Sequence, residues 1–340
     1  MNSKERLYLA LDGQSCDRPP CICPGGMMNM VTADVMKLAE VFMPEAHKDA
    51  AKMAALAKAV YDNGCFENYG VPFCMTVEAG EMGAAVDFGN MEYEPHVVEY
   101  AIETSSQWQQ LKPVDLEKGR SKVVVDAIRI LSQSGDNVPV IGNLTGPVSV
   151  ATSVIEPTVF YKELRKKKED AHAFMTFVTE QLIAFGRAQI EAGADIIAIS
   201  DPSGTGEILG PKFFEEFTVK YLNMLLDGLK DTGVRTIVHI CGQMHNVYSQ
   251  IDMVGSNALS FDSVVPMKEA REHLPERVLM GNVSTYALEF GTNEKVETLT
   301  RLCVKNGSDI ISPACGLGMN SPLTNVQAML KYLKKVETDA

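Results

Sequence analysis

The sequence predicts an α/β fold of the (β/α)8 type, a TIM barrel with an N-terminal helical extension. Three observations lead to this prediction: short apolar runs recur along the chain, helix-length segments separate them, and 340 residues is a length at which such barrels often form one domain. We therefore expect a single barrel domain over residues 1–340, in which residues 1–70 include the helical extension and the first strand. An open doubly wound sheet is the main alternative.

Eight short apolar runs are the candidate strands of this barrel. Most are apolar without alternation, which is typical of parallel strands that are buried on both faces. Polar or glycine-rich turns follow them, as expected for βα units. The eight runs cover residues 20–23, 73–77, 138–143, 195–200, 236–240, 258–261, 278–281 and 309–312.

The clearest helix covers residues 170–192. Its aromatic and aliphatic residues recur at helical spacing, and Gly193 ends the pattern. The candidate strand 195–200 follows at once. This order of helix, glycine and strand is the unit that a barrel repeats.

Composition and charge limit the function classes. The net charge of −13 disfavours nucleic acid and anionic membranes as partners, since both favour an excess of Lys and Arg. No apolar run reaches the ~18 residues that a membrane span needs, and the N-terminus lacks the pattern of a signal peptide. We expect a cytoplasmic protein, in which the eight cysteines would not form a disulfide framework.

The carboxyl ends of the candidate strands are much richer in glycine and polar residues than the opposite ends. Examples are SDPSGTGE at 200–207, HICGQMH at 239–245 and SPACGLGMN at 312–320. In (β/α)8 barrels the chemistry lies where strands end and βα-loops begin. We expect the active site at this end, with a lining drawn from Met27, Asn29, Glu78, Asn143, Asp201, Ser203 and Asn282.

Three candidate metal ligands belong to this end of the barrel. His239 and Cys241 are two positions apart, so a strand places both on one face, and Cys315 follows the last candidate strand. Two thiolates and one imidazole favour zinc, and three protein ligands leave a position open, as in catalytic sites. Asp262 is a candidate fourth ligand, with water or a purely hydrogen-bonding carboxylate as alternatives.

Several segments resemble the uroporphyrinogen decarboxylase superfamily, and the resemblance covers essentially the whole chain. They are GNLTGP at 142–147, DPSGTGEILGPKFFEEF at 201–217, GNVST at 281–285 and DIISPACGLGMNSPLTNVQAM at 309–329. The resemblance implies a single (β/α)8 barrel with an N-terminal helical extension.

Within this superfamily the chain is similar to the methylcobamide:coenzyme M methyltransferase branch. The decarboxylases carry an arginine-rich first-strand motif, whereas RPPCICPGGMMNMVT at 18–32 retains Arg18 and lacks the later arginines. The methyltransferase branch has an H-x-C pair and a late cysteine that bind zinc, and His239, Cys241 and Cys315 match them. Asp262 stands where that branch would have an acidic residue, usually Glu.

The resemblance implies a zinc-dependent methyltransferase. The methyl group would come from a methylated corrinoid on a small corrinoid protein and would go to a thiol such as coenzyme M, in methanogenesis or other one-carbon metabolism. Zinc deprotonates a coordinated thiol and makes it nucleophilic. The alternatives are a lyase of the uroporphyrinogen decarboxylase kind, a methyltransferase with a folate as acceptor, and a protein that binds metal or corrinoid without turnover.

Overall fold

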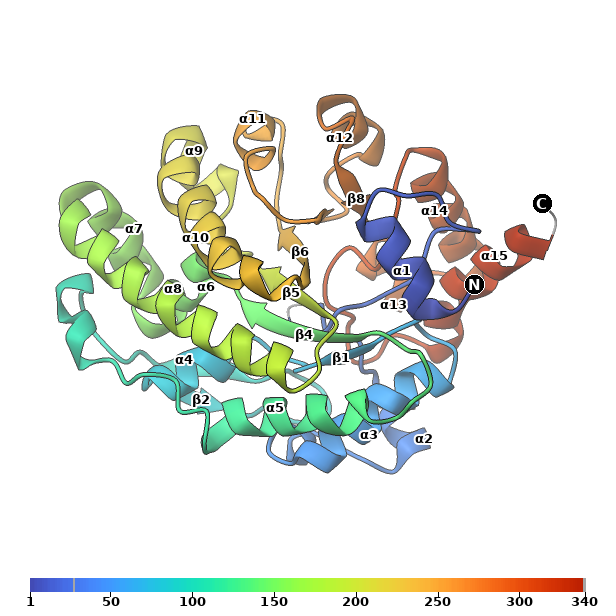
Figure 1. Cartoon of the computed structure of the whole chain (residues 1–340), viewed down its shortest axis with the longest axis horizontal. Helices are drawn as coiled ribbons and strands as arrows, with labels where there is room; N and C mark the ends of the chain where they lie inside the picture. Colours follow the sequence, from blue (N-terminus) through green and yellow to red (C-terminus); the bar gives the residue numbers. More distant parts are fainter. Residues whose placement is uncertain (27, 339–340) are drawn as a thin grey trace.

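Six parallel strands form the main sheet of the computed structural model, which describes residues 1–26 and 28–338. Each strand is buried, and the chain visits them in spatial order, as a barrel requires (Figure 1). Their order is β1 (Tyr69–Val71), β4 (Val140–Thr145), β5 (Ile196–Ser200), β6 (Arg235–Ile240), β7 (Ala258–Phe261) and β8 (Val278–Met280).

Two further segments close the sheet between β8 and β1. Residues 309–312 pair with β8 through the parallel bridge from Met280 to Ile310, and Ile311 forms a parallel bridge with Cys21. On the other side, the Glu67 amide donates to the Cys21 carbonyl at 2.8 Å. The candidate strands 20–23 and 309–312 therefore occupy the two remaining strand positions of the barrel, where each pairs through isolated bridges only. The predicted α/β barrel is confirmed.

The predicted strand at 73–77 is wrong. The strand at this place is β1, which ends at Val71, and α4 (Val77–Met82) begins where the prediction ended. Two features explain why β1 could not be predicted from the sequence pattern. Asn68 replaces ladder hydrogen bonds by pairing its side-chain amide with the Cys23 backbone, and a Cβ atom at Gly70 would lie 2.0 Å from the Pro24 carbonyl oxygen.

A short antiparallel hairpin follows α4 and was not predicted. It consists of β2 (Ala85–Asp87) and β3 (His96–Glu99). Its strands are largely exposed, so they lack the continuous apolar run by which the barrel strands were found.

Helices cover the outside of the sheet (Figure 1), with α3 against β1 and α8 against β4. The helix predicted at 170–192 is present as α8 (Lys168–Glu191), and α1 (Ser3–Leu11), α2 (Ala33–Ala39) and α3 (Ala50–Asp62) precede β1. The other helices are α5 (Gly119–Ser132), α6 (Pro147–Val154), α7 (Pro157–Lys166), α9 (Gly206–Phe213), α10 (Lys220–Leu229), α11 (Tyr248–Ile251), α12 (Met267–His273), α13 (Thr285–Phe290), α14 (Asn293–Lys305) and α15 (Leu323–Thr338). Shorter helices are η1 (Glu45–His47), η2 (Ser105–Gln110), η3 (Phe214–Val219, a π-helix) and η4 (Lys230–Thr232).

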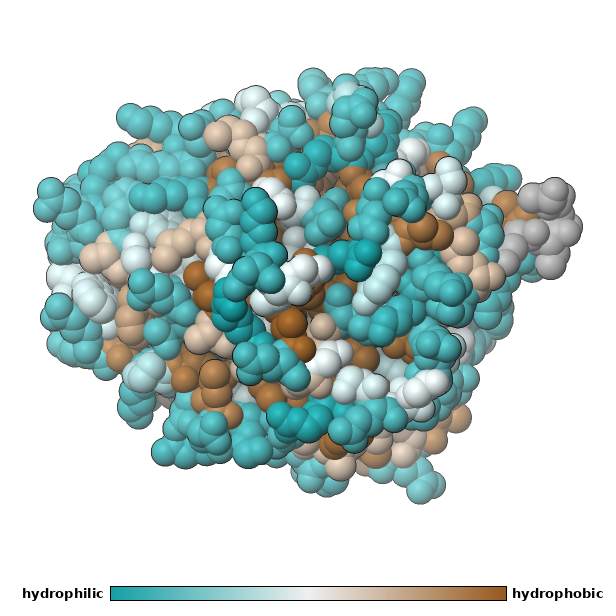
Figure 2. Space-filling model, viewed as in Figure 1, coloured by the Kyte–Doolittle hydropathy of each residue, from teal (hydrophilic) through white to brown (hydrophobic). Residues whose placement is uncertain are grey.

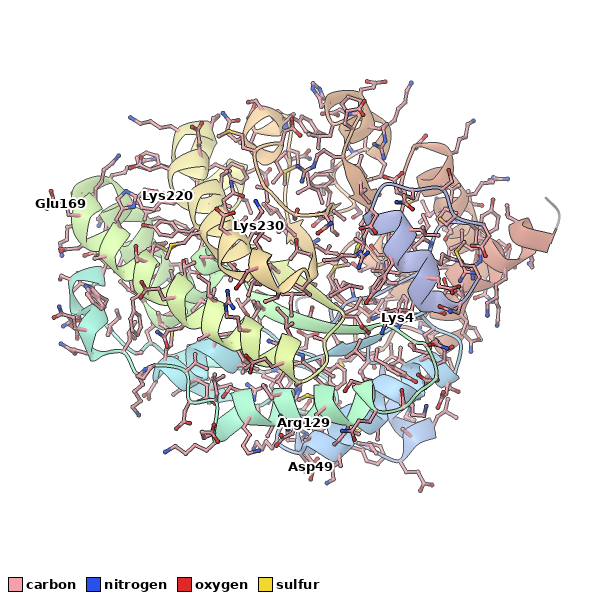
Figure 3. The ribbon with its side chains drawn as sticks, in the orientation of Figure 1. Lys4, Asp49, Arg129, Glu169, Lys220 and Lys230 are labelled. Atoms are coloured by element: carbon pink, nitrogen blue, oxygen red, sulfur yellow. The ribbon has the colours of Figure 1, made fainter. Side chains whose placement is uncertain are left out.

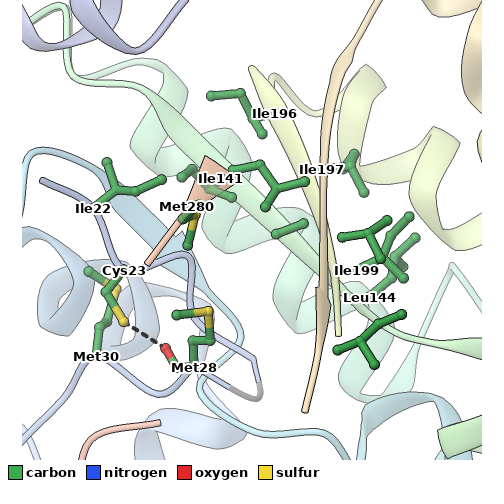
Figure 4. Close-up of a cluster of buried hydrophobic side chains, with 14 of the residues drawn as sticks. Ile22, Cys23, Met28, Met30, Ile141, Leu144, Ile196, Ile197, Ile199 and Met280 are labelled. Atoms are coloured by element: carbon green, nitrogen blue, oxygen red, sulfur yellow. Dashed lines mark hydrogen bonds between the residues drawn. The ribbon is translucent and has the colours of Figure 1, made fainter. Parts of the chain in front are cut away.

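Aliphatic and sulfur-containing side chains fill the interior of the barrel. Figure 4 shows Ile22, Met28, Ile141 and Met280 gathered there, and Cys23 Sγ donates to the Met28 carbonyl at 2.9 Å. Burial of such side chains is the main force that stabilises the fold.

Charged side chains such as those of Asp49, Arg129 and Glu169 project outward from the helices (Figure 3). Hydrophilic residues predominate on the face drawn in Figure 2. Among the helices described, none combines the length and the apolar character needed to cross a bilayer.

Candidate metal centre at the carboxyl end of the barrel

His239 lies near the carboxyl end of β6, where its side chain is buried in the barrel. The parallel register places it opposite Ser260 of β7, and its Nδ1 lies 3.0 Å from Ser260 Oγ. A hydrogen bond at one ring nitrogen fixes the tautomer and the orientation of an imidazole. With Nδ1 engaged in this way, Nε2 is turned toward Cys241, whose Sγ lies 3.3 Å away.

Cys315 completes the group. One ligand atom each from His239, Cys241 and Cys315 lies within 4.8 Å of the other two, and both cysteines are half-buried. In residues 1–26 and 28–338, no other group of three or more His, Cys, Asp or Glu side chains has such a geometry. The structure therefore brings together the three residues that the sequence singled out, from the ends of two distant strands.

The two thiols influence each other's pKa. A hydrogen bond from Cys241, together with His239, lowers the pKa of Cys315 to about 5 against the opposing effect of burial. The same hydrogen bond, followed by burial, raises the pKa of Cys241 above its ordinary range. The group thus carries a thiolate on Cys315 at neutral pH. Negative charge on soft donor atoms is the environment that a zinc ion requires.

Asp262 lies outside the close group. It follows β7 and its carboxylate accepts hydrogen bonds from the Val264 amide at 3.1 Å and the Ser263 hydroxyl at 3.2 Å. Its charge also contributes to the raised pKa of Cys241, so it acts on the group from a distance. The carboxylate of Asp262 holds the turn after β7, and it is not among the three side chains whose ligand atoms lie within 4.8 Å of one another.

Glu78 and Asp201, two predicted lining residues, are buried carboxylates that tie neighbouring βα-loops together. Glu78 accepts from the amide and the hydroxyl of Thr145 at 2.8 and 2.9 Å, and burial raises its pKa to about 7. Asp201 accepts from the amide and the hydroxyl of Ser149 at 2.8 and 2.7 Å, and burial raises its pKa to about 6. Their oxygens are engaged with the protein, so these side chains position loops.

The predicted amide side chains also bridge segments of the chain. Asn29 Nδ2 donates to the Val31 carbonyl at 2.9 Å, Asn143 Nδ2 to the Pro24 carbonyl at 2.6 Å, and Asn282 Nδ2 to the Asp262 carbonyl at 2.8 Å.

Two predicted lining residues remain. Ser203 donates its backbone amide to Ser149 Oγ at 3.0 Å, and its carbonyl accepts from the Tyr161 hydroxyl, also at 3.0 Å. Met27 lies outside the described residues.

Sequence reasoning missed two residues near the centre, Ser260 and Glu94. Ser260 could have been found from the register of β6 and β7, since it faces His239. Glu94 lies between β2 and β3, and burial, together with the charges of Cys74 and Cys315, raises its pKa to about 8. No local sequence pattern identifies Glu94, because only the folding of the hairpin β2–β3 brings it near Cys315.

A group of two cysteines and one histidine at the carboxyl end of a (β/α)8 barrel is typical of metal-dependent enzymes. Comparison with known proteins identifies the family. The family model for uroporphyrinogen decarboxylase (URO-D) matches residues 2–336, so the chain belongs to this family. The methylcobamide:CoM methyltransferase MtbA of Methanosarcina acetivorans is 34% identical over 333 residues, which cover 97% of each chain. A solved structure described as a methyltransferase from Methanosarcina mazei superposes with a TM-score of 0.91 at 28% identity, over 99% of both chains.

The decarboxylases themselves match less of the chain. The uroporphyrinogen decarboxylase of Myxococcus xanthus is 30% identical over 209 residues, which cover 59% of this chain and 58% of that protein. The resemblance to the methyltransferase branch, inferred above from the H-x-C pair and the late cysteine, is thus confirmed.

Proposed function

We propose that this protein is a methyltransferase that moves a methyl group from a methylated corrinoid to the sulfur of coenzyme M. The observation that carries the proposal is the convergence of His239, Cys241 and Cys315 within 4.8 Å at the carboxyl end of the barrel. The methyltransferase names of relatives that match nearly the whole chain support the reaction and the acceptor. The donor would arrive on a separate corrinoid protein.

We further propose that these three side chains hold zinc. The donor set fits this ion, since it offers two sulfurs and one imidazole nitrogen, a thiolate is already present, and Ser260 orients the imidazole from behind. Zinc bound there would keep the substrate thiol deprotonated and nucleophilic at neutral pH. Three protein ligands are typical of catalytic zinc sites, and the remaining position is left to the substrate thiol. Asp262 accepts from Val264 through Oδ1 and is not one of the three close side chains.

In the reaction itself, the sulfur of the substrate forms a bond to the methyl carbon. The carbon–cobalt bond breaks, and both of its electrons stay with the cobalt. The contribution of the chain is to hold the thiol at a fixed place in a half-buried site, which turns a bimolecular encounter into a positioned displacement.

Arg18 argues against a decarboxylase. Recognition of a polycarboxylate needs exposed guanidinium groups at the active site. The Arg18 guanidinium is buried instead in an ion pair with Glu67, at 2.7 Å, ahead of the segment 20–23 and thus at the amino end of the barrel. The one arginine retained from the decarboxylase motif therefore serves the fold.

Metal analysis and a spectroscopic assay test the proposal. The purified protein is expected to hold one zinc per chain and to demethylate methylcobalamin when coenzyme M is added. Cys241→Ala and Cys315→Ala should lose both properties, whereas Cys65→Ala, a change at a buried cysteine outside the centre, should keep them. Parallel reactions with homocysteine, tetrahydrofolate and uroporphyrinogen distinguish the other acceptors and the lyase. Turnover of uroporphyrinogen, or zinc retention by both centre variants, would overturn the proposal.

A further inference from the structure

A second cysteine with unusual surroundings lies in the loop between β1 and α4. Cys74 is 2% exposed, and Arg120 Nη2, from the first turn of α5, donates to its Sγ at 2.8 Å. Arg120 Nη1 also donates to Thr76 Oγ1 at 2.9 Å, and that hydroxyl lies 3.5 Å from the same sulfur. The sulfur of Cys74 is thus held against a fixed cation and a hydroxyl, and it is not a member of the group of His239, Cys241 and Cys315.

His47 is the other member of this cluster. Its side chain is 1% exposed, and its backbone carbonyl accepts from Arg120 Nε at 3.4 Å. The ring contributes to the stabilisation of the Cys74 sulfur, and apart from this contact neither ring nitrogen has a partner with hydrogen-bonding geometry among the described residues. A buried polar atom without a partner is costly, and such atoms call for an explanation in terms of a ligand or a function.

Charge decides the protonation state of Cys74. Burial by itself would raise the pKa of its thiol, but the charge of Arg120, with the contact to His47, outweighs burial and holds the pKa well below its ordinary value. Burial, together with the charges of Cys74 and Cys315, raises the pKa of Glu94 to about 8, so the Glu94 carboxyl is mostly neutral at pH 7. The other cysteines of the barrel wall differ: burial raises the pKa of Cys65 to about 12.

A cavity leads to the cation of this cluster. It measures about 960 Å³ and lies between α4, β2 and the start of α5, lined among others by Val77, Gly80, Phe88 and Arg120. The Arg120 guanidinium packs on the Phe88 ring at 5.1 Å from its centroid. A small neutral molecule in the cavity therefore reaches the group that contacts the Cys74 sulfur.

We propose that Cys74 is a second reactive thiolate, a modification site for hydroperoxides and other small neutral electrophiles, with Arg120 and His47 stabilising the anion and the cavity beside Arg120 admitting the reagent. With hydrogen peroxide, the thiolate sulfur attacks one oxygen and the oxygen–oxygen bond breaks. Sulfur is oxidised by two electrons to a sulfenic acid, the peroxide is reduced, and the second oxygen leaves as hydroxide into the solvent.

Competitive labelling tests the proposal in the intact protein. Folded protein is treated at pH 6 with limiting iodoacetamide, or with hydrogen peroxide and a sulfenic-acid trap, and each cysteine is scored by peptide mass spectrometry. At pH 6 a thiol with an ordinary pKa is well under 1% thiolate, so a thiol with a low pKa has far more of the reactive form. A low-pKa thiolate is a weaker nucleophile, but this lowers its labelling rate by less than the larger thiolate fraction raises it. Cys74 should therefore react about tenfold faster than Cys16, a half-buried thiol whose pKa is raised by burial.

Two further measurements secure the assignment. Arg120→Leu should slow labelling of Cys74 at pH 6 about tenfold and much less at pH 9.5, whereas Arg187→Leu, which removes a surface arginine paired with Asp231, should not. If Arg120→Leu does not fold, the pH–rate profile of Cys74 in the unaltered protein serves instead, with a midpoint below that of Cys16. Equal rates for Cys74 and Cys16 at pH 6, or no labelling of Cys74, would overturn the proposal.

Discussion

Replacing Ser260 by alanine isolates the role of the side chain behind His239. Ser260 is fully buried, and its hydroxyl is the partner of His239 Nδ1 at 3.0 Å. Ser260→Ala leaves that ring nitrogen buried and unpaired, at a cost of about 1–3 kcal/mol, and frees the ring to turn. Loss of such a partner typically lowers metal affinity about 10- to 100-fold, and we expect the zinc affinity of the variant to fall within this range.

The assay is zinc affinity by competition with a chromophoric chelator, with thermal unfolding measured alongside. Ser256→Ala is the matched control, because the hydroxyl of Ser256 donates to the Ala258 carbonyl at 2.9 Å at the other end of β7, far from the centre. Ser260→Thr keeps a hydroxyl and should retain most of the affinity. If Ser260→Ala binds zinc as tightly as Ser256→Ala does, the reasoning about imidazole orientation is refuted.

Three further changes test the surroundings of the centre. Burial raises the pKa of Glu78 from 4.5 to about 7, so the stability that Glu78 contributes is present below pH 4.5 and is lost as the pH rises through 7. Between pH 4.5 and pH 8, the free energy of unfolding measured with urea should therefore fall by about 3 kcal/mol more in the unaltered protein than in Glu78→Gln. An equal fall in both proteins would contradict this prediction. A Cβ atom at Gly146 would lie 2.3 Å from Asp201 Cβ, so Gly146→Ala should lower the free energy of unfolding by about 1–3 kcal/mol relative to Gly255→Ala, where the nearest atom is 3.6 Å away. Asp262→Asn should keep one zinc per chain on metal analysis, and loss of the metal would instead make Asp262 a ligand.

The sequence located best those strands whose own residues are mostly apolar and which pair with their neighbours through regular backbone hydrogen bonds. β5, β6 and β7 are mostly apolar and almost entirely buried, as is typical of parallel strands that are covered on both faces. β1 escaped because its pairing is tertiary: Asn68 substitutes for backbone partners, and Gly70 is needed for close approach of Pro24. Neither requirement has a periodicity that a single sequence can show.

The same distinction applies to the site. His239 and Cys241 could be paired from the period of a strand, and Cys315 could be added because all parallel strands of a barrel end at one rim. Polar character alone did not reveal function. Glu78 and Asn143 are polar residues at strand ends, but their side chains satisfy backbone groups of other loops.

The pKa values of Cys74 and Cys315 are both lowered, but by different physical causes, and the difference bears on what each thiol can do. The Cys74 sulfur is paired with Arg120, a permanent cation, and Cys74 itself is almost fully buried. The anion of Cys315 is sustained by a proton on Cys241, at a half-buried place where the partners can be exchanged. A metal can take over from the proton on Cys241 at the second site but would have to expel a guanidinium at the first. We therefore expect charge compensation to favour binding of a metal and an incoming thiol at Cys315 and Cys241, and to leave Cys74 to small reagents that enter beside Arg120.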